Sequence, residues 1–106
     1  MSSPKRVHGP ALVTDAAATK YTVPADTKFI LRHIHVQNPS ASIVDFTMSI
    51  GTDAAATRIY DGYSIPADSI LDVWVYIPLV AAEIIQALAG TTNILTLTLS
   101  GDERVL

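Results

Sequence analysis

The sequence predicts an all-β protein: an antiparallel β-sandwich of the jelly-roll or immunoglobulin-like type, with about seven or eight strands. Short β-rich runs are separated by turn residues roughly every 8–12 residues, a spacing typical of sandwiches. Strands do not alternate with helical patterns, which argues against a parallel sheet with a cofactor crevice. The 106 residues suit one domain with one hydrophobic core.

The first ten residues are predicted to be an extended arm outside the core. They contain Pro4, Gly9 and Pro10 beside basic residues, and they show no apolar period. The predicted organisation is therefore an arm over residues 1–10 and a single sandwich domain over residues 11–106. A frayed terminus is the alternative, since chain ends are commonly loose.

The strands of the domain are predicted from runs of β-forming residues. The clearest is 42–50, in which every second residue from Val44 onward is apolar, as in a half-buried antiparallel strand. The other predicted strands are 11–14, 20–23, 28–37, 57–60, 63–65, 69–77 and 92–100.

Two connections between these strands carry specific predictions. Asp61-Gly62 has the sequence of a two-residue type I′ turn and predicts a hairpin between the short runs on either side. The stretch 78–90 permits a short helix capped by Gly90, because its alanines and its apolar spacing allow one. A turn followed by a strand at 84–89 is favoured, since both neighbours are strands.

An internal repeat is the most informative feature of the sequence. Residues 14–19 (TDAAAT) return as residues 52–57. Residues 21–27 (YTVPADT) return, with conservative changes, as residues 63–69 (YSIPADS). Each Pro-Ala-Asp is predicted to form an equivalent corner that ends a short strand and leads into a longer one. Two such corners suggest pseudo-symmetric halves of a sandwich.

Composition excludes several classes of function. Apolar residues make up 49% and charged residues 16%, which suits a folded protein with part of its surface committed to a partner. The net charge of −3 supplies no basic field for phosphates, so we expect no nucleic acid partner. The absence of cysteine excludes disulfides and thiolate chemistry.

Neither a signal peptide nor a membrane span is predicted. The N-terminal residues lack the apolar core of a signal peptide. The most apolar stretch, 79–97, is interrupted by Glu83, Gln86 and Asn93. We therefore expect a protein that is made in a cytoplasm and binds no membrane.

Enzyme signatures are missing, so we predict no catalytic residue and no cofactor. The sequence has no glycine-rich phosphate loop and no Gly-x-Ser-x-Gly elbow. A metal-dependent hydrolase is a remote third possibility.

His33 and His35 are the first candidates for a metal site. Two apart in a strand, they point to the same face, and they would need a third ligand from Asp45 or another carboxylate on a neighbouring strand. Nothing in the sequence fixes that ligand, so solvated or interface histidines are favoured.

The aspartates are candidates for a calcium site or a carboxylate pair. All but one lie in predicted turns, where aspartate caps its own backbone, and they are not clustered. They are Asp15, Asp26, Asp53, Asp61, Asp68 and Asp72. No metal is predicted.

The predicted strand 69–77 is apolar on both faces, around a lone Asp72. A two-layer sandwich buries only one face of such a strand, so the second face, with Ile70, Trp74 and Tyr76, requires a cover. We predict that these residues belong to a protein interface, since aromatic residues are enriched at interface centres. Modestly exposed aromatics on an ordinary sheet, or under a loop, are the alternative. Lys5 and Arg6 of the arm complete the predicted interface.

With these residues in view, the chain resembles small β-sandwich structural proteins of tailed-phage virions. The resemblance covers roughly residues 19–101. It rests on the motif at 20–38, the alternating strand after it, the second corner at 63–69 and the closing LTLTLSG at 95–101.

The resemblance implies a non-enzymatic virion protein: a capsid decoration (cement) protein or a tail accessory protein. It implies other virion proteins, major capsid or tail proteins, as partners. Such proteins usually occur in several copies with symmetry, so we expect a homo-oligomer located in the virion and made in the host cytoplasm. Similar sandwiches also occur as carbohydrate- or host-surface-binding modules, which is the alternative function.

Overall fold

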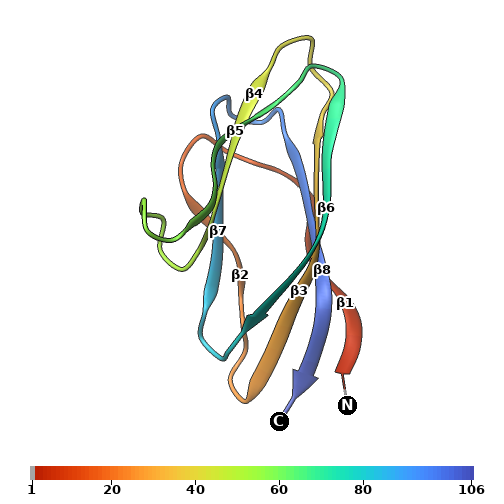
Figure 1. Ribbon diagram of the computed structural model, residues 1–106, viewed down its shortest axis with the longest axis vertical. Coiled ribbons are helices and arrows are strands. Elements are labelled where there is room, and N and C mark those ends of the chain that lie inside the picture. The colour runs from red at the N-terminus through yellow and green to blue at the C-terminus, as the bar shows by residue number, and fades with distance from the viewer. Residues whose placement is uncertain (1) are drawn as a thin grey trace.

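The computed structural model describes residues 2–106, which form eight strands in two antiparallel sheets packed face to face (Figure 1). The strands are β1 (Ser2–Leu12), β2 (Ala18–Thr22), β3 (Thr27–Asn38), β4 (Val44–Ile50), β5 (Arg58–Ile65), β6 (Ser69–Leu79), β7 (Ile84–Ala89) and β8 (Thr96–Val105). These residues contain no helix, so the predicted antiparallel β-sandwich is confirmed. Within residues 2–106, no helix is long and apolar enough to cross a membrane.

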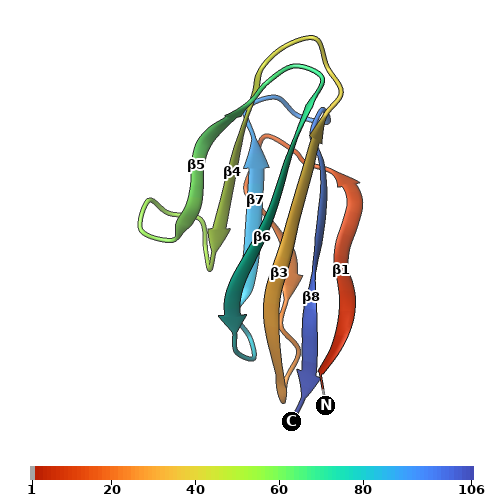
Figure 2. The same cartoon turned by 45° about the vertical axis from the view of Figure 1, so that its right-hand side comes forward.

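Each sheet has four strands within the described residues. Sheet A has the order β1-β8-β3-β6, and sheet B has the order β2-β7-β4-β5. Figure 2 shows the strands of sheet A side by side, with β6 and β1 at its two edges. Strands next to each other in a sheet are mostly distant in the sequence, so the fold depends on long-range pairing.

The core lies between the two sheets and consists of the side chains that point inward from alternating positions of the strands. In β3, Phe29, Leu31, Ile34 and Val36 are fully buried while most residues between them are not. Burial of one such side chain contributes about 1.5–3 kcal/mol. The remaining buried apolar residues are Val13, Val23, Val44, Phe46, Met48, Ile65, Leu71, Leu79, Ile85, Ala87, Ala89, Leu95, Leu97 and Leu99.

The two Pro-Ala-Asp corners are equivalent, as predicted. Both cross from sheet B to sheet A, one from β2 to β3 and the other from β5 to β6. Asp26 and Asp68 adopt left-handed φ values of 55° and 53°, a conformation that aspartate tolerates better than most residues. The hydroxyls of Thr27 and Ser69 each donate to the carbonyl two residues earlier, over 3.1 and 3.2 Å.

The other half of the repeat is not structurally equivalent, so the expected pseudo-symmetric halves are wrong. Residues 14–19 cross from β1 in sheet A to β2 in sheet B. Residues 52–57 instead join β4 to β5 within sheet B. The repeat therefore encodes a corner and not half a sandwich.

The predicted arm is also wrong, because residues 2–10 belong to the edge strand β1. Lys5 and Arg6 pair with Gly101 and Ser100 of β8. Register shifts after Arg6 and after His8 interrupt the alternation of side chains, so the segment shows no period of two. Val7 nevertheless packs against the core, and β1 ends at Leu12, so it contains only the first two residues of the predicted strand 11–14.

Asp61-Gly62 does not form the predicted hairpin turn. Both flanking runs pair with the same strand, β4, and together form β5. Between the pairs Phe46–Tyr63 and Met48–Tyr60, the two residues Asp61 and Gly62 oppose the single residue Thr47, which is a β-bulge, and Gly62 has a left-handed φ of 62°. A hairpin would have paired the two runs with each other.

The favoured strand at 84–89 is confirmed as β7, which lies between β2 and β4. The strand predicted at 92–100 begins only at Thr96 and continues to Val105. Residues 92–94 form a turn instead, in which Asn93 adopts a left-handed φ of 59°.

Candidate functional site

The outward side of β6 exposes a row of apolar and aromatic side chains. Leu71, Val73, Val75, Ile77 and Leu79 turn toward the core. On the opposite side the exposed fractions of Ile70, Trp74 and Tyr76 are 55%, 76% and 67%. Among residues 2–106, no loop covers the two aromatic rings, which lie on an edge strand of sheet A.

The neighbouring strand β3 places both predicted histidines on this same outer face. His33 is paired with Trp74 and His35 with Asp72 in the antiparallel register. Residues directly opposite in such a register have Cβ atoms about 4.5–5.5 Å apart. The imidazole of His33 consequently stacks on the indole of Trp74, with ring centres 4.2 Å apart and planes 19° apart.

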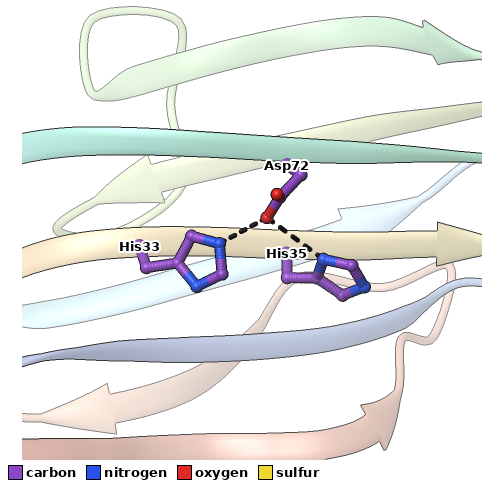
Figure 3. A group of neighbouring side chains, drawn as sticks. All are labelled: His33, His35 and Asp72. Carbon is purple, nitrogen blue, oxygen red and sulfur yellow. Dashed lines mark hydrogen bonds and ion pairs between the residues drawn. The ribbon is translucent and has the colours of Figure 1, made fainter.

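Asp72 lies between the two histidines and contacts both (Figure 3). Its Oδ1 atom is within hydrogen-bonding distance of His33 Nε2 and lies 3.2 Å from His35 Nδ1. These hydrogen bonds, the one from His33 first, lower the pKa of the Asp72 carboxyl. The three side chains are partly accessible to solvent, so the cluster is open to molecules outside the chain.

Sequence reasoning did not identify Asp72 as the third member of this group. Asp45, which it named, lies in β4 of the other sheet and accepts a hydrogen bond from Ser64 over 3.0 Å. The signal for Asp72 was its position as the lone acid on the outward side of its strand. Only the β3–β6 register shows that Asp72 lies beside the two histidines, and the sequence does not determine this register.

Tyr76 and Arg32 extend the outer face toward the centre of sheet A. The guanidinium carbon of Arg32 lies 5.9 Å from the centre of the Tyr76 ring, a cation–π distance. Arg32 also pairs with Asp102 of β8 over 3.1 Å. Arg32 is therefore held between an aromatic ring and a carboxylate.

Lys5 and Arg6 lie on β1, at the far edge of sheet A from β6. Lys5 pairs with Glu103 over 3.1 Å. Both line a hollow of about 420 Å³ that Trp74 also lines, so three of the five predicted interface residues meet there. Ile70 and Tyr76 lie outside it. The other residues of the hollow are Pro4, Arg32, His33, Ser100, Gly101 and Asp102.

The remaining aspartates have structural partners or lie apart. Arg58 bridges Asp53 and Asp61, with nitrogen–oxygen distances of 3.0 and 2.8 Å, and these contacts hold the β4–β5 connection. The Arg58 contacts, first, and the Ser49 hydroxyl lower the pKa of Asp53. Among residues 2–106, the group of three or more potential metal ligands is His33, His35 and Asp72.

No protein-family model, no curated protein and no solved structure matches this chain. The function must therefore be inferred from the surface that the two sheets build.

Proposed function

We propose that this protein is a non-enzymatic structural protein of a tailed bacteriophage virion. It acts as a capsid decoration (cement) or tail accessory protein that binds neighbouring virion proteins through the outer face of sheet A. The observation that carries the proposal is the exposed row of Ile70, Trp74 and Tyr76 on an edge strand. The sequence resemblance described above supports the class of assembly.

The chemistry of this face suits a protein partner. Stable interfaces combine a centre rich in aromatic residues with a polar, charged rim. Here Trp74 and Tyr76 form the centre, Arg32 lies on the neighbouring strand β3, and Lys5 and Arg6 lie on β1 at the far edge of the same sheet. A partner that presents apolar side chains bordered by acidic groups would complement it.

The energetics favour attachment in several copies. Burial of one aromatic ring removes about 150–250 Å² from water at about 25 cal/mol per Å², so two rings contribute several kcal/mol. Loss of translational and rotational freedom costs about 4–15 kcal/mol, which consumes much of that gain. A homo-oligomer on a repeating lattice overcomes this cost, because several weak contacts then act together.

The decisive experiment is to locate the protein in intact particles by cryo-microscopy. Density for the sandwich at repeated positions on the capsid or tail is expected, with β6 turned toward a neighbouring subunit. Particles that lack the protein, or that hold it with β6 facing solvent, would contradict the proposal. The molar mass of the isolated protein in solution then shows whether its copies associate with one another before they attach to the particle.

A carbohydrate- or host-surface-binding module is the second candidate, favoured by the hollow beside Trp74. An exposed indole gives a sugar ring a flat surface, and Ser100, Asp102 and Arg32 add polar groups beside it. Pull-down with purified cell-wall glycans tests this candidate. Binding that is lost in Trp74→Ala and in Asp102→Asn, without any protein partner, would favour it over the first.

A further inference from the structure

We propose that His33, His35 and Asp72 bind one divalent transition-metal ion of the zinc class on the outer face of sheet A. Each side chain offers one ligand atom, and these three atoms all lie within 4.8 Å of one another. Zinc binds histidine nitrogen at about 2.0–2.1 Å and carboxylate oxygen at about 2.0–2.2 Å. Ligand atoms this close reach a common ion with small side-chain rotations.

The backbone holds the three ligands in place on two adjacent strands. His33 and His35 share a face because they are two residues apart in β3. Asp72 of β6 lies directly opposite His35. The next pair along the two strands on the same face is His33 with Trp74. Figure 3 shows the two imidazoles and the carboxylate turned toward one another. Sites on rigid strands are better preorganised than sites on loops.

The stack between Trp74 and His33 restrains one of the ligands. The indole covers one face of the imidazole ring, which limits its rotation about the side-chain bonds. Contacts that orient a metal-binding histidine raise affinity without touching the ion. We therefore assign Trp74 a positioning role in addition to its exposed contact surface.

The donor set selects the class of ion. Two imidazole nitrogens and one carboxylate oxygen suit zinc and neighbouring transition metals, whereas calcium and magnesium prefer oxygen ligands. Three protein ligands leave a coordination position open for water or for a group from another molecule. The nearest cation on β3, Arg32, is paired with Asp102, which reduces its repulsion of an incoming ion.

The alternative is a metal-free hydrogen-bonded pair of histidines on one carboxylate. In that state each imidazole carries a proton on the nitrogen facing Asp72, since a carboxylate oxygen only accepts. Metal binding requires the other tautomer of each neutral imidazole, in which the proton has moved to the ring nitrogen that faces away from Asp72 and the nitrogen beside the carboxylate offers its lone pair to the ion. A measurement of zinc binding by the protein therefore distinguishes the metal site from the metal-free hydrogen-bonded cluster.

Isothermal titration of the chelator-treated, tag-free full chain with ZnCl₂ tests the proposal. One zinc ion per chain is expected, with no comparable binding of MgCl₂ or CaCl₂. His35→Gln and Asp72→Asn should each weaken zinc binding by more than about tenfold, since even the loss of an outer partner costs about 10–100-fold. His8→Gln and Asp45→Asn are the matched controls, with one histidine and one acid removed elsewhere, and should bind zinc as the wild type does.

Two further measurements keep the result clear if a variant folds poorly. Imidazole nitrogen NMR of the unaltered protein should show zinc-dependent shifts at His33 and His35 and none at His8. Trp74→Phe tests the positioning role of the indole that stacks on His33. This variant should lose less affinity for zinc than His35→Gln does. The absence of saturable zinc binding by the wild type, or equal losses in His8→Gln and His35→Gln, would leave the cluster as a hydrogen-bonded pair only.

Discussion

Trp74 stacks on His33 across the β3–β6 strand pair, with the ring centres 4.2 Å apart. This contact joins the exposed aromatic row of β6 to the polar cluster formed by His33, His35 and Asp72. A change at Trp74 therefore affects two properties, the apolar contact surface and the orientation of a potential metal ligand. The aromatic row and the polar cluster therefore form one continuous surface on the outer face of sheet A.

Replacement of Trp74 by alanine should reduce attachment to particles much more than it reduces stability. The side chain is 76% exposed, so its loss costs the fold about 1 kcal/mol, mostly the ring stack. The measurement is the thermal melting of the isolated protein alongside its retention on particles. Tyr63→Ala, an exposed aromatic on the edge strand of sheet B, is the matched control and should retain attachment. A collapse of melting with normal binding by the remaining folded protein would mean that Trp74 is a folding residue and not a contact residue.

Asn38→Ala should lower the free energy of unfolding by about 2–4 kcal/mol. The side chain is fully buried, and its amide nitrogen lies 2.9–3.1 Å from the carbonyl oxygens of Ser42, Ile65 and Pro66. Truncation removes this donor from all three carbonyls, of which the one at Ile65 forms the buried bond, while Ser42 keeps the Ser40 hydroxyl as a donor. Urea denaturation measures the change, and Gln37→Ala, at the exposed position beside it, is the control. Equal losses in both variants would show that the hydrogen bonds of Asn38 add nothing.

Gly101→Ala should destabilise the fold by more than about 3 kcal/mol. A Cβ atom at this position would overlap the carbonyl oxygen of Ile30 and approach Phe29 Cζ to 2.6 Å. Gly62→Ala is the comparison, because it has open space around it but a left-handed φ, and should cost about 1–2 kcal/mol. Denaturation midpoints of the two variants test the difference, and the reverse order would contradict the packing of β8 against β3.

Tyr21 should titrate near pH 12 in the folded protein. Burial, first, and the nearby Glu103 carboxylate raise the pKa of its hydroxyl from 10.0 to about 12. The hydroxyl lies 3.4 Å from Glu103 Oε2, so β2 of sheet B is linked to β8 of sheet A. Because the folded pKa is the higher one, the stabilisation is complete below pH 10 and is lost as the pH rises toward 12.

Ultraviolet titration and melting over this pH range check the behaviour of Tyr21. Burial also raises the pKa of Tyr60, so Tyr21→Phe is needed to isolate the first residue. The variant should lose the highest-pH part of the tyrosine titration and part of the alkaline decline in stability. Loss of titration amplitude near pH 10 in Tyr21→Phe, instead of at the highest pH, would place the Tyr21 hydroxyl in water.

Local sequence determined the elements whose signal lies within one strand or one turn. Alternation in 42–50 identified β4, because burial of one face imposes a period of two. The Pro-Ala-Asp corners were identified from their repeat, since proline and aspartate favour the required backbone whatever lies around them. The exposed aromatic row was also predicted, because a strand apolar on both faces cannot be covered by two layers.

Tertiary structure alone decided which strands pair and in what register. Residues 2–10 carry no strand period, yet they form β1 because β8 offers a free edge for hydrogen bonds. Asp61-Gly62 has the sequence of a turn but forms a bulge, because both flanking runs pair with β4. The neighbourhood of His35 and Asp72, 37 residues apart in the chain, follows from the β3–β6 register. Register is fixed by the packing of distant residues, and no local propensity encodes it.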